Sequence, residues 1–175
     1  MEVLNQIPKI NMLDNPTGCC PKFNPDIYDE KLIEIDSLDM VKAKTRSFLY
    51  MPLNMGSVMT KVMKSISDAD AEVKDNYLIL SKDISMWKAE HYFLVSNIVK
   101  GMDNIKFSGT FITKVFEGGY NQIPNWIKEM ETFVKAQGYI IKNTYYFYTT
   151  CPKCAKVYGK NYVVLFAEVK KSNQF

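Results

Sequence analysis

Four cysteines in two close pairs are the residues whose spacing could support metal or redox chemistry. Cys19 and Cys20 are adjacent, and Cys151 and Cys154 enclose a Pro-Lys dipeptide. Thiolates bind zinc, and a Cys-x-x-Cys pair that opens a helix after a strand can act in thiol redox chemistry. Adjacent cysteines project in different directions, and the stretch after Cys154 is too short for a redox helix. We therefore favour structural or site-lining thiols and expect neither metal nor cofactor, with zinc on all four sulfurs and redox chemistry as the alternatives.

Glu117 and Glu168 are the candidate acid–base groups, because the chain has only one histidine. We assign that residue, His91, no role. A single histidine argues against a metal site with several histidines or a catalytic histidine dyad. Glu168 lies in an otherwise apolar segment, and Glu117 ends another. A carboxylate among aromatic rings has its pKa raised by desolvation and suits a general base. The alternative for both glutamates is a charge exposed at a strand end.

Aromatic residues make up 13% of the chain, which favours a large core or an apolar cavity. Alternation places Tyr146 and Tyr148 on one face of a strand, and one of its two faces must meet the helices. Tyr146 is the candidate donor to a developing oxyanion. The candidate ligand-binding residues are Trp87, Tyr120, Tyr148, Tyr162 and Phe166. Trp87 lies in a polar loop, where an indole suits stacking on a flat ligand. The alternative for each ring is ordinary core packing.

Hydrophobic periodicity predicts the elements that must position these residues. In the first half we expect strands and one helix in the order strand, helix, strand, strand: 32–48, 55–66, 77–80 and 91–95, with a loop at 81–90. The second half has the same order: 106–116, a helix from Pro124 to Gly138, 144–150 and 161–169, with a loop at 151–160. Proline in a first helical turn and glycine after a last one are typical helix boundaries.

These patterns predict an α+β fold built as a tandem repeat of a strand–helix–strand–strand module. We expect antiparallel sheets with helices packed on one side and a ligand cleft at the pseudo-twofold seam. The expected division is an N-terminal arm (1–30) that packs on the body, a first repeat (31–101) and a second repeat (102–175).

Composition excludes several classes of function. The chain has 175 residues with 47% hydrophobic and 23% charged residues, which is the balance of one folded domain. A net charge of +3 is too small to indicate nucleic-acid binding. No apolar run approaches the ~20 residues of a membrane span, and no signal peptide is visible. We expect a cytoplasmic monomer or homodimer that binds neither nucleic acid nor membrane.

Five stretches carry a resemblance to a known family. The segment Phe116–Tyr120 (Phe-Glu-Gly-Gly-Tyr), followed by a helix with Trp126, resembles the turn before the second helix of GyrI-like small-molecule-binding domains. The stretches Thr17–Pro25 and Tyr148–Ala167, with Arg46-Ser-Phe48 and Ser108-Gly-Thr-Phe111, resemble a stand-alone bacterial branch of that superfamily labelled "hydrolase". Some GyrI-like proteins are cyclopropanoid cyclopropyl hydrolases, which detoxify DNA-alkylating natural products.

The resemblance implies a duplicated module with an apolar cleft that binds a hydrophobic aromatic small molecule. It implies a cofactor-independent hydrolase that adds water to a strained cyclopropane. Glu168 or Glu117 would activate the water, and a tyrosine would polarise the conjugated carbonyl. The alternatives are a non-catalytic binder or sensor of hydrophobic drugs, cationic ones included, and an interaction protein stapled by zinc.

Overall fold

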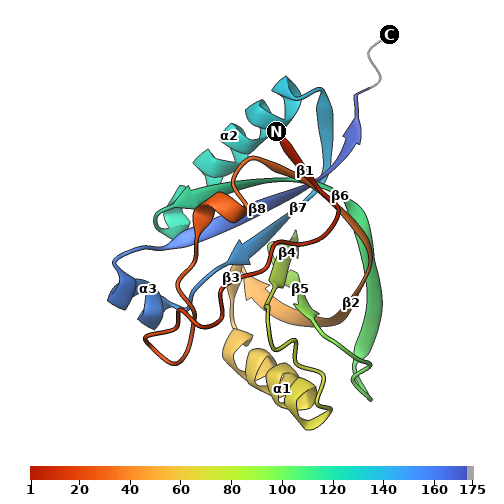
Figure 1. Ribbon diagram of the computed structural model, residues 1–175, viewed down its shortest axis with the longest axis vertical. Helices are drawn as coiled ribbons and strands as arrows, with labels where there is room; N and C mark the ends of the chain where they lie inside the picture. The colour runs from red at the N-terminus through yellow and green to blue at the C-terminus, as the bar shows by residue number, and fades with distance from the viewer. Residues whose placement is uncertain (173–175) are drawn as a thin grey trace. The chain divides into compact units, whose positions relative to one another are not determined.

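The computed structural model describes residues 1–172 and divides into two compact units. One unit combines Met1–Asp36 with the chain from Gly109 onward, and the other is Ser37–Ser108. Apart from short intervening elements, the order strand, helix, strand, strand occurs twice along the chain (Figure 1). The first copy consists of β2 (Lys31–Phe48), α1 (Met55–Asp68), β4 (Ile79–Ser85) and β5 (Lys88–Leu94), and the second of β6 (Asp103–Glu117), α2 (Ile123–Ala136), β7 (Tyr139–Tyr148) and β8 (Tyr162–Lys171). This order confirms the α+β class predicted from periodicity. The cleft and the domain boundaries expected from the sequence stay predictions.

In the unit Ser37–Ser108, one helix packs against antiparallel strands. Strand β5 (Lys88–Leu94) pairs with β2 (Lys31–Phe48) on one side and with β4 (Ile79–Ser85) on the other, and the short β3 (Met51–Pro52) pairs with β2. Helix α1 (Met55–Asp68) buries Val62 and Ile66 against Val41 and Phe93. The helix forms because its apolar residues recur on one face, which needs a partner surface to leave water.

In the other unit, α2 covers one face of the antiparallel strands β6, β7 and β8. Strand β8 (Tyr162–Lys171) pairs with β6 (Asp103–Glu117) and with β7 (Tyr139–Tyr148). Helix α2 (Ile123–Ala136) follows the turn η2 (Tyr120–Gln122), has Pro124 in its first turn and ends before Gly138, which has φ +79°. Its apolar stripe packs on the sheet through Trp126, Met130 and Val134.

The N-terminal residues pack on the opposite face of this sheet. The short β1 (Glu2–Leu4) pairs in parallel with the start of β2, and the turn η1 (Pro25–Ile27) precedes the fully buried Tyr28. Tyr28 accepts a hydrogen bond through its carbonyl oxygen from Thr113 Oγ1 at 2.6 Å. The Phe23 ring lies 6.0 Å from that of Phe147. Aromatic rings of the N-terminal segment therefore form part of the core of this unit.

Two loop predictions are wrong. The predicted loop at 81–90 is a hairpin in which β4 and β5 are joined by Met86 and Trp87. The segment contains many polar residues because one face of the hairpin is exposed, and its composition is therefore typical of a loop. The predicted loop at 151–160 contains helix α3 (Pro152–Tyr158), with proline at its first position and Gly159 at φ +66° after it. Those two boundary signals are the features that predict a helix here.

The helices of the part that the structure describes are too short or too polar to cross a membrane.

Candidate functional site

The two cysteine pairs lie together although 131 residues separate Cys20 from Cys151 along the chain. All four Sγ atoms are within 4.8 Å of one another. The Sγ of Cys19 lies 3.7 Å from that of Cys20 and 3.9 Å from that of Cys151. The expectation that Cys19 and Cys20 point apart is therefore wrong. Cys151 is the N-cap of α3, and Cys154 is buried in its first turn.

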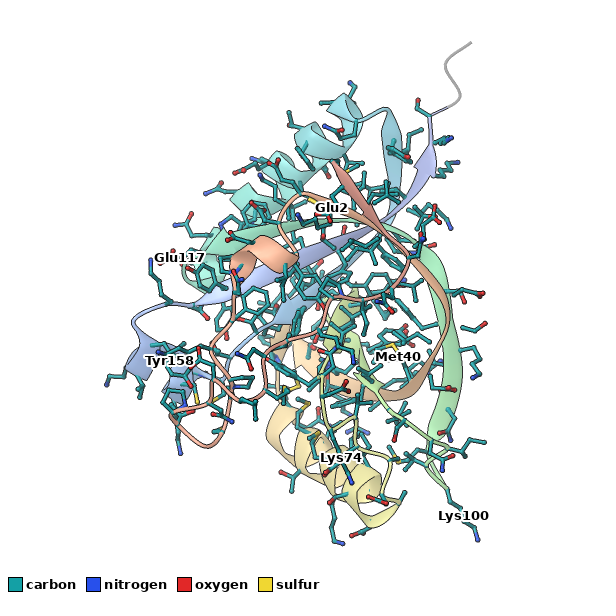
Figure 2. The ribbon with its side chains drawn as sticks, in the orientation of Figure 1. Glu2, Met40, Lys74, Lys100, Glu117 and Tyr158 are labelled. Carbon is teal, nitrogen blue, oxygen red and sulfur yellow. The ribbon has the colours of Figure 1, made fainter. Side chains whose placement is uncertain are left out.

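Thr17 and Tyr158 connect the N-terminal segment to α3 around these sulfurs. Thr17 Oγ1 lies 3.3 Å from Cys154 Sγ and 3.0 Å from the Tyr158 hydroxyl. The backbone N–H of Cys151 donates to Cys20 Sγ at 3.4 Å. Figure 2 labels Tyr158 in α3, and the N-terminal segment loops beside that helix in Figure 1. The contacts fix two distant segments in one position.

The local environment gives the thiols of Cys154 and Cys20 different pKa values. The hydroxyl of Thr17 hydrogen bonds the Cys154 thiol and lowers its pKa to about 7. Burial raises the pKa of the Cys20 thiol. The Cys154 thiol therefore ionises more readily than the Cys20 thiol.

A groove of about 450 Å³ lies between the end of β6 and α3. It is bounded by Glu117, Gly118, Tyr120, Pro152, Ala155, Lys156, Gly159, Lys160 and Asn161. We call it the Tyr120 groove. Two residues that the sequence predicted as functional, Glu117 and Tyr120, therefore share one concave surface. Figure 2 labels Glu117 at the end of β6.

Charge and aromatic packing position the side chains of the Tyr120 groove. Lys160 Nζ donates to both carboxylate oxygens of Glu117, at 2.8 and 3.0 Å, and this pairing raises the Lys160 pKa. The Tyr120 ring meets that of Tyr148 edge-on at 5.3 Å. Burial raises the pKa of the Tyr120 phenol, with a smaller effect of Cys151. At neutral pH the Tyr120 phenol is therefore protonated, and it lines the same groove as the Glu117 side chain that Lys160 holds.

Tyr146 and Tyr148 lie on the face of β7 that α2 covers. Their rings stack at 6.3 Å, and Tyr146, 7% exposed, belongs to the cluster with Trp126 and Met130. Tyr145 and Phe147 lie on the other face, toward Phe111 and Phe23 respectively. Alternation predicts correctly that Tyr146 and Tyr148 share a face, but only the position of α2 shows that this face meets the helix.

Glu168 lies on the face of β8 opposite α2, and its carboxylate is paired. Lys142 Nζ donates to Oε1, and Asn143 Nδ2 donates to Oε2 at 2.6 Å. The side chain is 14% exposed. Its surroundings are thus a lysine and an amide as well as aromatic rings, which the sequence did not predict.

Phe166 and Tyr162 lie on the same face as Glu168, beneath the N-terminal segment. Phe166 is fully buried, with its ring 5.5 Å from that of Tyr28 and 6.2 Å from that of Phe111. Tyr162 is partly exposed, and the centroid of its ring lies 6.0 Å from that of the Phe23 ring. In this structure Phe166 presents no surface to a ligand.

Trp87 lies within an exposed apolar patch of the unit Ser37–Ser108. Its ring is 5.5 Å from that of Phe48, and each residue is 52% exposed. Ser47 N, near the end of β2, donates to Trp87 O, and Tyr50 N, just after β2, donates to Met86 O. These two bonds join the turn to this segment. The exposed large apolar residues of the turn and of the neighbouring segments are Phe48, Leu49, Tyr50, Leu53, Ile84, Met86 and Trp87. Exposed apolar side chains that gather on one surface often mark a binding site.

No sequence pattern predicts the polar trio around His91, which consists of His91, Thr45 and Ser81. His91 is 2% exposed, with Thr45 Oγ1 at 2.9 Å from Nε2 and Ser81 Oγ at 2.8 Å from Nδ1. Burial lowers the His91 pKa to about 4. Each of the three residues stands on a different strand, so the trio is a structural polar network within one sheet.

The fold of this chain is similar to those of several known structures. The chain superposes on EcmrR in its complex with DNA with a TM-score of 0.63 at 13% identity, covering 80% of this chain and 56% of that one. For the C-terminal domain of EcmrR alone the TM-score is 0.58 at 16% identity, and the match covers 82% of this chain and 98% of the domain. The chain thus spans just over half the length of EcmrR.

A hydrolase from Listeria innocua has the same fold, with a TM-score of 0.57 at 10% identity and coverage of 82% of this chain and 92% of that one. No curated protein sequence matches the chain significantly. The model of the bacterial hydrolase family matches residues 10–169. The chain therefore has the GyrI-like fold that its Phe-Glu-Gly-Gly-Tyr turn suggested, and it belongs to the bacterial hydrolase family.

Proposed function

We propose that this protein is a hydrolase that binds a hydrophobic aromatic small molecule in the Tyr120 groove and adds water to it. The observation that carries the proposal is the meeting of Glu117 and Tyr120 in one groove, in a chain of the bacterial hydrolase family. The sequence predicts Glu117 as an acid–base group and Tyr120 as a ligand-binding residue, and they reach the groove from the end of β6 and from η2. Family membership favours hydrolysis over binding alone.

The substrate class that best fits these groups is an aromatic compound with a strained cyclopropane conjugated to a carbonyl. Tyr120 donates a hydrogen bond to the carbonyl oxygen, and Lys156 adds positive charge where negative charge develops. Glu117, held by Lys160, accepts a proton from the attacking water as the general base. The water oxygen bonds to a ring carbon, the strained C–C bond breaks, and its electron pair moves to the carbonyl oxygen. The proton lost by the water ends on that oxygen, so the product is the substrate plus one water.

A turnover assay tests the proposal with matched variants. Purified protein is incubated with such a cyclopropane, and the water adduct is followed by mass spectrometry. We expect Glu117→Gln to lower kcat by roughly 10²–10⁴-fold, as loss of acid–base function does. Tyr120→Phe should lower it by about 10²-fold, as loss of one oxyanion donor does. The control is Glu131→Gln, an exposed glutamate of α2.

Glu168→Gln shows which glutamate acts on the water. A loss of turnover with Glu168→Gln but not with Glu117→Gln would move the chemistry out of the Tyr120 groove. Turnover no faster than in buffer, from protein that is folded by circular dichroism, would contradict the hydrolase proposal.

A non-catalytic binder is the second candidate function, and the exposed patch around Trp87 favours it. The chain has two tryptophans, of which Trp87 is 52% exposed and Trp126 is 6% exposed. A flat ligand that stacks on Trp87 should quench the solvent-exposed component of the emission. We expect Trp87→Phe to abolish this quenching during titration with an aromatic cation, while the emission of Trp126 remains. Equal quenching in the wild type and in Trp87→Phe would exclude stacking on this patch.

A further inference from the structure

We propose that Cys19, Cys20, Cys151 and Cys154 form a structural zinc site that ties the N-terminal segment to α3. The inference goes beyond the proposed hydrolase function, and it stands on the arrangement of the sulfur atoms.

The distances between the sulfurs fit a tetrahedron around one zinc ion. With Zn–S bonds of about 2.3 Å, a tetrahedral site has S···S edges of about 3.8 Å. The observed Sγ···Sγ distances from Cys19 are 3.7 Å to Cys20 and 3.9 Å to Cys151, and all four sulfurs lie within 4.8 Å of one another. A disulfide instead needs about 2.05 Å between sulfurs, and all four cysteines are free thiols here.

The identity of the ligands selects the metal and its role. Soft thiolates favour zinc over magnesium or calcium, which prefer oxygen ligands. Four protein sulfurs fill a tetrahedral coordination sphere, so no position remains for water or substrate. The site is therefore structural, and the catalytic step assigned to the Tyr120 groove does not pass through it.

Neighbouring groups support thiolates at this place. The Cys151 N–H donates to Cys20 Sγ at 3.4 Å, and the Thr17 hydroxyl lies 3.3 Å from Cys154 Sγ. Such outer contacts orient metal ligands. Zinc with four thiolates carries two net negative charges, and Lys153 and Lys156 lie on the helix that carries two of the ligands.

The turn before Cys19 explains how adjacent cysteines reach one ion. The N–H of Gly18 donates to the Asn15 carbonyl at 3.1 Å, and Gly18 has φ +66°. This left-handed residue redirects the chain immediately before the first ligand. The Thr17 hydroxyl then accepts from the N–H groups of Cys19 and Cys20 at 3.3 and 3.4 Å. The loop is thus held in a conformation that presents both sulfurs to α3.

Metal analysis of the purified untagged protein tests the site directly. Inductively coupled plasma mass spectrometry should find one zinc per chain. The Cys151→Ser variant should lose most of it, whereas Lys153→Ser, a change on the exposed side of the same helix, should keep it. Chelation should lower the Tm of the wild type by roughly 10 °C or more, because binding energy at a structural zinc site is folding energy.

Cobalt substitution gives a second test that needs no variant. Cobalt(II) added to reduced, metal-free wild type should produce the intense visible bands of a tetrahedral ion and a near-ultraviolet thiolate charge-transfer band, and one equivalent of zinc should displace it. Less than a tenth of a zinc per chain, with the weak spectrum of octahedral cobalt, would overturn the proposal. So would a wild-type mass lower by two or four hydrogens, because disulfides would then account for the pairs. Neither result depends on turnover, so the two proposals fail separately.

Discussion

Replacing Phe166 with alanine is expected to lower the free energy of unfolding by about 3–5 kcal/mol. The ring is fully buried and lies against those of Tyr28 and Phe111. Its removal loses the transfer free energy of a large apolar group and leaves a cavity between β8 and the N-terminal segment, which relaxes only partly because both sides are held by the core. Urea unfolding at neutral pH, with the midpoint and slope fitted together, measures the change.

The Phe166 experiment also separates a core role from the ligand-binding role that the sequence suggested. Phe166→Leu keeps most of the volume and should cost clearly less than the alanine variant. Ile140→Ala removes a side chain that is 47% exposed on β7 and should change stability by about 0.5 kcal/mol or less. If Phe166→Ala left stability unchanged but weakened ligand binding, the ring would belong to a site and not to the core.

Acidification from pH 7 to pH 4 is expected to remove about 3 kcal/mol of stability through His91 alone. Burial lowers the pKa of this imidazole from 6.5 to about 4 in the folded state. Between these two values the unfolded chain takes up a proton that the folded chain does not. The contribution of His91 is therefore fully present above about pH 6.5 and is lost as the pH falls toward 4.

The His91→Gln variant isolates this effect from the titration of carboxylates. Its amide can still hydrogen bond toward Thr45 or Ser81, but it cannot take up a proton in this range. Stability is measured by urea unfolding at half-unit steps of pH, and the wild-type curve should fall more steeply than that of the variant between pH 6.5 and 4. Parallel curves would show that His91 is protonated in the folded protein as readily as in the unfolded chain.

Local periodicity was enough to predict the strands and helices that form most of the fold. The apolar stripe that begins at Met55 and the proline and glycine around 124–138 predicted α1 and α2, which run over Met55–Asp68 and Ile123–Ala136. These signals lie within one helix, so the sequence contains them completely. The sequence around α3 also contains helix boundary residues. The helix was not predicted because it has only seven residues, and so short a helix needs tertiary contacts to be stable.

Alternation predicted which residues share a strand face but not what that face meets. Tyr146 and Tyr148 share one face of β7, and Phe166 and Glu168 share one face of β8, because residues two apart on a strand point to the same side. Helix α2 covers the first pair, and the N-terminal residues Phe23 and Tyr28 lie over the face of the second. A two-residue period is identical for both faces, so only packing decides between core and surface.

The sequence by itself determined the chemistry available to this protein: thiols, carboxylates and phenols, with a single histidine. It also determined the α+β class, because hydrophobic period and turn residues are local properties of the chain. Only the tertiary structure decided which of these groups meet. It brought Cys19 and Cys20 to Cys151 and Cys154, and Glu117 to Tyr120, because contacts between distant residues arise from the burial of shared apolar surface, which no local pattern specifies.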